Sequence, residues 1–224
     1  MPESDSIRAI WEEPLDFDFA VNGPPYLPEG TRGVRMASEG GGDHLSLFAW
    51  LHRGFAGIEK AELGVLVAVL RAAAIVHQTH HWQTRGGNFY GDHLLFERIY
   101  NDSVGFVDQV AERAVGSGSA GLVDPRTQTA LVAGLVQTWI GKDMPTSFDM
   151  VTRSLKVVQC VVACIQLASS TLESKGQLSD GTENLLQGIS DKHEEFVYLL
   201  QQRQGGRVAS SYNRSASYSY GRTA

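Results

Sequence analysis

Residues 80–118 read HHWQTRGGNFYGDHLLFERIYNDSVGFVDQVAERAVGSG. The Gly86-Gly87 pair stops an apolar helical pattern that runs from about Lys60 to Thr84. Asn88 suits the N-cap of a second helix, which continues to the Gly- and Ser-rich break at residues 116–121. This stretch therefore predicts two long helices joined by a tight turn, with histidines on both sides of the turn.

The helical pattern continues after the break. Asp124-Pro125 opens a short apolar helix to about Ile140, because a proline in the first turn loses no hydrogen bond. Two more long helices are expected from about Ser147 to Glu173 and from about Ser179 to Gln204. Strand patterns are almost absent. The sequence predicts an all-α four-helix bundle, with a short helix in the crossover between the second and third long helices.

Composition divides the chain into four segments. Residues 1–42 hold many Pro, Gly and acidic residues and are expected to form an irregular, extended N-terminal arm. Residues 43–59 fit a short amphipathic helix, with Asp43 as its cap and Leu45 on its apolar face. The bundle is assigned to residues 60–204, and residues 205–224 are expected to form a flexible tail of Arg, Tyr, Ser and Gly.

The net charge and the length of the uncharged runs argue against two classes of protein. A formal net charge of −6 over 224 residues argues against a globally basic nucleic-acid binder. The longest uncharged runs, at 127–141 and 157–172, are shorter than the ~20 residues of a membrane helix, so no membrane span is expected. The acidic N-terminus lacks a secretory pattern, which predicts a cytoplasmic protein. Cys160 and Cys164, in an apolar helical pattern, are interpreted as buried free thiols.

The second helix carries the candidate metal chemistry. His93 and Glu97 are spaced i, i+4, as are Asp108 and Glu112, and the four positions form one polar stripe. Imidazole and carboxylate together suit ferrous iron, manganese or zinc. The alternative for either pair alone is an ordinary solvated helix face. His81, just before the Gly-Gly turn, can fold beside His93, so that the turn presents two imidazoles to a metal.

Distance constrains this site. Glu97 and Asp108 are about 16 Å apart on a straight helix, so the two pairs cannot hold one metal within one chain. An antiparallel second copy, crossing near Asp102 at a two-fold axis, would bring one pair opposite the other. Such a contact makes two equivalent sites automatically. The sequence therefore predicts metal sites that lie between two subunits.

Residues 80–118 resemble the signature of the Dps family, the miniferritins called DNA-binding proteins from starved cells, and residues 181–200, GTENLLQGISDKHEEFVYLL, resemble that family's fourth helix. The likeness covers roughly residues 60–204 and implies a ferritin-like fold. It also implies a ferroxidase centre at a two-fold interface, with one subunit giving the first three ligands and its neighbour the last two: His81, His93, Glu97, Asp108 and Glu112. The family usually has Asp where Glu97 stands.

The resemblance further implies a function. Family members form a hollow shell of twelve subunits that oxidises ferrous iron, preferentially with hydrogen peroxide, stores the ferric mineral and protects DNA from oxidative damage. The competing hypothesis is a nucleoid-binding or structural shell whose metal site is degraded or occupied by zinc. Trp82 would pack against the centre or be buried in the core. His77 and His80 are interpreted as structural residues or as residues that support the metal ligands, and His193 as a solvent-facing residue.

Two further sets of residues follow from the same resemblance. Acidic residues near the start of the fourth helix would line an iron-entry pore, and the candidates are Glu173, Asp180 and Glu183. DNA binding by flexible basic termini would make the protein nucleoid-associated. Because the N-terminus is acidic, only the C-terminal arginines qualify as phosphate contacts, and these are Arg203, Arg207, Arg214 and Arg222.

Overall fold

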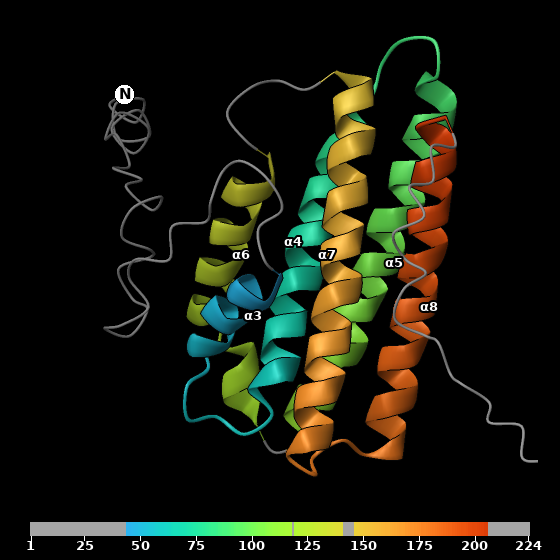
Figure 1. Cartoon of the computed structure of the whole chain (residues 1–224). Helices are drawn as coiled ribbons and strands as arrows, with labels where there is room; N and C mark the ends of the chain where they lie inside the picture. The colour runs from blue at the N-terminus through green and yellow to red at the C-terminus, as the bar shows by residue number, and fades with distance from the viewer. Residues whose placement is uncertain (1–43, 118, 141–145, 206–224) are drawn as a thin grey trace, which may run out of the picture.

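The computed structural model describes residues 44–117, 119–140 and 146–205 (Figure 1). Four long helices lie side by side: α4 (Ala61–Gln83), α5 (Phe89–Gly116), α7 (Ser147–Ser174) and α8 (Asp180–Arg203). The described residues contain no strand. The predicted all-α four-helix bundle is therefore confirmed. The expected arm at 1–42 and the tail beyond Gly205 lie outside the described residues.

Three smaller elements accompany the bundle. A 3₁₀ turn, η1 (Ala120–Val123), and α6 (Pro125–Ile140) occupy the crossover from α5 to α7, where a short helix was expected. The helix α3 (His44–Arg53) lies with α6 on one side of the bundle (Figure 1). It ends earlier than the expected 43–59 segment, since Gly54 follows and Gly57 turns the chain with a φ of 79°. Leu45, expected inside, is exposed.

Local signals start the helices as the sequence suggests. Thr146 and Asp149 form a reciprocal capping box at α7: each side chain accepts a hydrogen bond from the other's backbone N–H. Pro125 is the first residue of α6, and the Asp124 carboxylate accepts a hydrogen bond from the Thr127 N–H at 2.9 Å. Asn88 precedes α5 but its side chain makes no capping hydrogen bond. The predicted helices thus begin within a residue or two of their expected starts.

The centre of the bundle is α4. Its side chains are buried on nearly every face, and Leu63, Leu66 and Leu70 are fully enclosed. Each buried leucine contributes about 1.5–3 kcal/mol relative to an exposed one. A second, smaller cluster around Phe96 and Phe196 joins α5, α7 and α8. The two clusters together pack the four long helices against one another.

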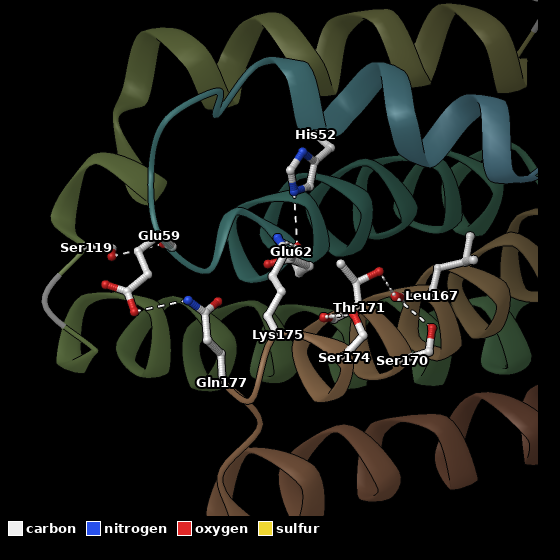
Figure 2. A network of polar contacts seen from close by, with 10 residues as sticks. All are labelled: His52, Glu59, Glu62, Ser119, Leu167, Ser170, Thr171, Ser174, Lys175 and Gln177. Atoms are coloured by element: carbon white, nitrogen blue, oxygen red, sulfur yellow. Dashed lines mark hydrogen bonds and ion pairs between the residues drawn. The ribbon is translucent and has the colours of Figure 1, made fainter.

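A buried ion pair ties α3 and α7 to the start of α4. Glu62 has a fully buried side chain, and its Oε1 accepts hydrogen bonds from Lys175 Nζ at 2.6 Å and from His52 Nε2 at 3.1 Å (Figure 2). Its Oε2 is buried without a partner in the described structure. Since Lys175 follows α7 and His52 belongs to α3, this single carboxylate connects three helices.

Two helices are long and apolar enough to cross a membrane by length and composition alone, α4 and residues Asp149–Ser174 of α7. The sequence predicted no membrane span because its longest uncharged runs are too short. The charged residues Glu62 and Arg71 interrupt α4, so this helix was not among those runs. In the bundle, 83% of the apolar window of α4 and 50% of that of α7 are buried. A core helix of a soluble protein has the same properties, so this criterion gives only weak support for a membrane span.

Candidate metal centre

The turn between α4 and α5 brings two histidines together. After Gln83, the Thr84 backbone N–H and hydroxyl both donate to the His80 carbonyl, at 2.9 and 2.7 Å, and close the helix. Gly86 has a φ of 91°, a conformation that residues with a side chain rarely adopt. The chain reverses here and α5 returns along α4. His93, in the second turn of α5, therefore lies beside His81.

His81 and His93 are held by a reciprocal pair of hydrogen bonds. The Nδ1 atom of each ring lies 3.0 Å from the backbone carbonyl oxygen of the other residue. A carbonyl oxygen can only accept, so each Nδ1 carries the proton and donates it. The rings stack with centroids 3.7 Å apart and an interplanar angle of 23°. In the neutral form, each Nε2 then keeps a free lone pair, the form in which imidazole binds a metal.

Carboxylates continue from this pair along α5. Glu97 lies one turn beyond His93 and is half-buried, whereas Asp108 and Glu112 are exposed. Among the described residues none of these three carboxylates has a hydrogen bond or an ion pair. Because α5 is one unbroken helix, about 16 Å separates Glu97 from Asp108 along its axis. In the described part of a single chain, no three His, Cys, Asp or Glu side chains converge in a geometry that could hold a metal.

Two more histidines, His77 and His80, precede His81 on α4. His80 Nδ1 lies 2.8 Å from the Ser154 hydroxyl, and His77 Nδ1 donates to the Ala73 carbonyl at 2.7 Å. Burial lowers the pKa of His80 to about 3 and that of His77 to about 4, so both rings are neutral near pH 7. Their predicted structural role agrees with this geometry. The expectation for His193 is wrong, because its ring is buried between Phe106 and Phe196.

Apolar side chains surround the histidine pair on the surface of the chain. Trp82 is 68% exposed, so its burial in the core of its own chain is excluded. Leu94 and Phe89, both on α5, are also exposed. A groove of about 460 Å³ continues this surface between α4, α5 and α6, where Ile75, Tyr100 and other side chains line it. Within one chain, an apolar face thus follows the same helix that carries the candidate ligands.

A buried carboxylate at the start of α5 forms an ion pair with an arginine at the end of α8. The Asp92 side chain is 1% exposed, and its two oxygens accept hydrogen bonds from Arg203 Nε at 2.5 Å and Nη2 at 3.0 Å. The sequence reading missed this pair, since its members are 111 residues apart. The guanidinium of Arg203 is engaged here, next to His93, while Arg207, Arg214 and Arg222 lie outside the described residues.

The three candidate pore residues lie at the opposite end of the bundle from the histidine pair. Glu173 is the last residue but one of α7, while Asp180 and Glu183 stand in the first turn of α8. All three side chains are exposed, and Glu183 accepts a hydrogen bond from Gln187 at 3.0 Å. These three acids therefore flank the turn between α7 and α8.

Known proteins with related sequences decide the family. No family model matches the chain. It is 30% identical over 139 residues to the nutrient stress-induced DNA-binding protein of Nostoc sp., covering 62% of this chain and 72% of that protein. It is 23% identical over 152 residues to the DNA protection during starvation protein of Brevibacillus brevis, covering 63% of this chain and 97% of the relative.

The chain belongs to the Dps family. Solved Dps structures share its fold, which confirms the ferritin-like arrangement of the bundle. The Dps of Thermosynechococcus elongatus superposes with a TM-score of 0.57 at 17% identity, covering 74% of this chain and 99% of that one. DpsC of Streptomyces coelicolor gives 0.55 at 22% identity, covering 68% and 84%. The helices α4 and α5 of this Dps-family chain, and the histidine turn between them, thus belong to a ferritin-like four-helix bundle.

Proposed function

We propose that this protein is a Dps-type ferroxidase and iron-storage shell, which oxidises ferrous iron with hydrogen peroxide and protects DNA. The observation that carries the proposal is the reciprocal bonding of His81 and His93 through their Nδ1 atoms, which leaves the Nε2 atom of each ring for a metal. A half-buried carboxylate, Glu97, stands one turn away. Two imidazoles and one carboxylate form a donor set that suits ferrous iron, and zinc would fit the same donors.

A second copy of the chain would complete each site. The partner's α5 would cross antiparallel near Asp102, so that Asp108 and Glu112 of one copy face His81, His93 and Glu97 of the other. The exposed apolar face beside the histidine pair and the groove between α4, α5 and α6 support such a contact, because a stable monomer rarely leaves so much apolar surface to water. The proposed assembly is a homo-oligomer, with twelve subunits as in the family.

The proposed chemistry uses iron as substrate. Two ferrous ions bound together would each give one electron, so that one peroxide is reduced to water without release of a hydroxyl radical. The carboxylates Glu97, Asp108 and Glu112 would neutralise the metal charge, and the histidines would hold the ions through neutral nitrogen atoms. The exposed acids at the α7–α8 turn would attract ferrous ions to the shell, which is the proposed role of Glu173, Asp180 and Glu183.

The direct test is rapid mixing of anaerobic, metal-free protein with ferrous iron and then peroxide. Ferric absorbance should develop rapidly in the wild type and slow by at least ten-fold in His81→Ala and in Asp108→Ala. Thr79→Ala serves as a matched control, since its hydroxyl only donates to the carbonyl of Ile75 on an exposed face. Unchanged kinetics in both ligand variants would instead support the second hypothesis, a nucleoid-binding or structural shell with a degraded or zinc-occupied site.

DNA binding is proposed only for the segment after the bundle. Arg207, Arg214 and Arg222 would contact phosphates, and many copies on one shell would add avidity. Arg203 stands apart, because its guanidinium is already bonded to Asp92. Salt-dependent gel retardation of the whole protein and of a chain ending at Gln204 tests this. Equal retardation of DNA by the two proteins would contradict a DNA-binding tail. If the tail binds DNA and makes this cytoplasmic protein nucleoid-associated, the truncated chain should no longer retard DNA.

A further inference from the structure

A pocket of about 290 Å³ lies between the last turn of α6 and the first turns of α7, and it contains none of the candidate metal ligands. Its lining consists of two residues of α6 and five of α7: Thr138, Trp139, Asp149, Thr152, Arg153, Lys156 and Val157. The four polar residues of α7 are spaced i, i+3, i+4 and i+7, so they share one face of this helix. One helix face thus presents two cations, one carboxylate and one hydroxyl to the same pocket.

Arg153 is a half-buried cation without a partner. Its guanidinium forms no hydrogen bond or ion pair in the described part of the chain, and its Nη1 atom is buried. A buried donor that has lost its water without gaining an acceptor destabilises the fold, and a charged donor does so more strongly. Such groups are normally satisfied by an ion or an ordered water. Because the guanidinium is a planar fork of donors, it matches two oxygens of an oxyanion.

Three more hydrogen-bond donors border the pocket. The Lys156 side chain is exposed and has no ion pair among the described residues. The Thr152 hydroxyl accepts a hydrogen bond from Gln204 Nε2 at 2.9 Å, which leaves its own proton to donate. The indole N–H of Trp139 likewise has no acceptor in the part of the chain that the structure describes. Together with Arg153, these groups suit an anion with several acceptor oxygens.

Asp149 determines which anion fits. Its Oδ2 accepts hydrogen bonds from the Thr146 hydroxyl at 2.6 Å and from the Thr146 backbone N–H at 3.0 Å, whereas its Oδ1 has no hydrogen bond among the described residues. These hydrogen bonds and the charge of Arg153 lower the pKa of Asp149, so the carboxylate is ionised near neutral pH. An ionised carboxylate repels an anion unless the anion brings a proton that the carboxylate can accept. Inorganic phosphate keeps a proton near neutral pH, whereas sulfate and a phosphodiester do not.

We propose that this pocket binds inorganic phosphate, with Arg153 and Lys156 bonded to its charged oxygens and Asp149 accepting a hydrogen bond from its P–OH group. The Thr152 hydroxyl and the Trp139 indole supply further donors. Phosphate would give the Arg153 guanidinium the partner that the described chain does not supply, and it would connect α6 to α7. Because the ligand binds the folded protein, it stabilises the fold. No iron takes part, so the site does not depend on the proposed ferroxidase function.

The test is titration of the full-length, metal-free protein with inorganic phosphate, followed by calorimetry and by thermal unfolding. Phosphate should bind and raise the Tm, whereas sulfate at the same ionic strength should bind at least ten-fold more weakly, a comparison that requires no variant. Lys156→Gln changes an exposed side chain and should weaken phosphate binding several-fold. Arg153→Gln should weaken it at least ten-fold. Asp149→Asn should narrow the difference between phosphate and sulfate.

Arg126→Gln is the matched control, because it removes the same charge from a side chain of α6 that is 85% exposed and does not line the pocket. Its affinity for phosphate should equal that of the wild type. No binding of phosphate by the wild type, or equal affinity for sulfate, would overturn the proposal. Unchanged binding in both Lys156→Gln and Arg153→Gln would overturn it too, as would an equal loss in Arg126→Gln, which would indicate a general effect of net charge.

Discussion

His81 and His93 bind each other's backbone through their Nδ1 atoms, at 3.0 Å in both directions. The two residues belong to different helices, and the rings nevertheless stack at a centroid distance of 3.7 Å. This relationship depends on the left-handed Gly86, because a wider turn would separate the ends of α4 and α5. The turn therefore sets both the tautomer and the position of the two candidate metal ligands before any metal arrives.

The negative charge of the Glu97 side chain should affect the rate of iron oxidation more than its length does. Glu97→Asp restores the residue that the family usually carries, and we expect iron oxidation to change by no more than a few-fold. Glu97→Gln keeps the length but removes the negative charge, so the initial rate of ferric absorbance should fall at least ten-fold. Stopped-flow absorbance of the two variants beside the wild type measures this. Equal rates of iron oxidation in the Glu97→Gln variant and the wild type would exclude Glu97 from the metal site.

The position of the second carboxylate pair can be tested by mixing two inactive subunits. In co-expressed His81→Ala and Asp108→Ala chains, a pair of unlike subunits has one site with both defects and one with none. Random pairing should therefore leave about a quarter of the sites intact and restore a corresponding share of the wild-type rate. Shells of either variant alone should stay inactive. Failure of the mixed shells to exceed the single variants would contradict sites shared between subunits.

Much of this fold could be predicted because α5, α7 and α8 repeat their apolar residues with helical spacing and the breaks carry Gly, Pro or Asn. The approach of His81 to His93 also followed from a local signal, the Gly-Gly turn. Asp92 and Arg203 could not be paired in this way, since 111 residues separate them and nothing local distinguishes either one.

Other errors have physical causes. His193 has Lys192 and Glu194 as neighbours, which suggested a polar face, but its own position on α8 points between two phenylalanines. Core burial was one of the two roles considered for Trp82, and in one chain its side chain is exposed, as is that of Leu94. Apolar periodicity indicates that a face is covered, but it does not tell whether the same chain or a second copy covers it.

Glu62 should make the protein sensitive to acid. Burial alone would raise its pKa, but hydrogen bonds from Lys175, from its own backbone N–H and from His52 bring the pKa below the ordinary value of 4.5. Because the folded-state pKa is lowered, the stabilisation is present above pH 4.5 and is lost as pH falls through the folded value. Glu62→Gln should therefore lower the free energy of unfolding by about 1–3 kcal/mol near neutral pH and flatten its decline in acid.

Glu59 provides the matched control for this prediction. Its carboxylate is exposed and accepts only a 3.2 Å hydrogen bond from Gln177 (Figure 2). Glu59→Gln should change the free energy of unfolding by less than about 0.5 kcal/mol. Urea unfolding at fixed protein concentration, from neutral pH to below 4.5, compares the variants. An acid decline in Glu62→Gln as steep as in the wild type would contradict the assignment.

The pair of Asp92 and Arg203 should respond unequally to loss of its two members. Asp92 is 1% exposed, whereas the Arg203 side chain is 29% exposed and can turn toward water when its partner is neutralised. We expect Asp92→Asn to cost about 1 kcal/mol and Arg203→Gln about 3 kcal/mol, because the second change strands a buried carboxylate. The double variant should be no less stable than Arg203→Gln. Arg98→Gln, which breaks an exposed pair with Glu195, should destabilise the protein least of the variants. Urea unfolding at constant protein concentration ranks the four chains, and a greater loss for Asp92→Asn than for Arg203→Gln would refute this account of how α8 anchors the histidine turn.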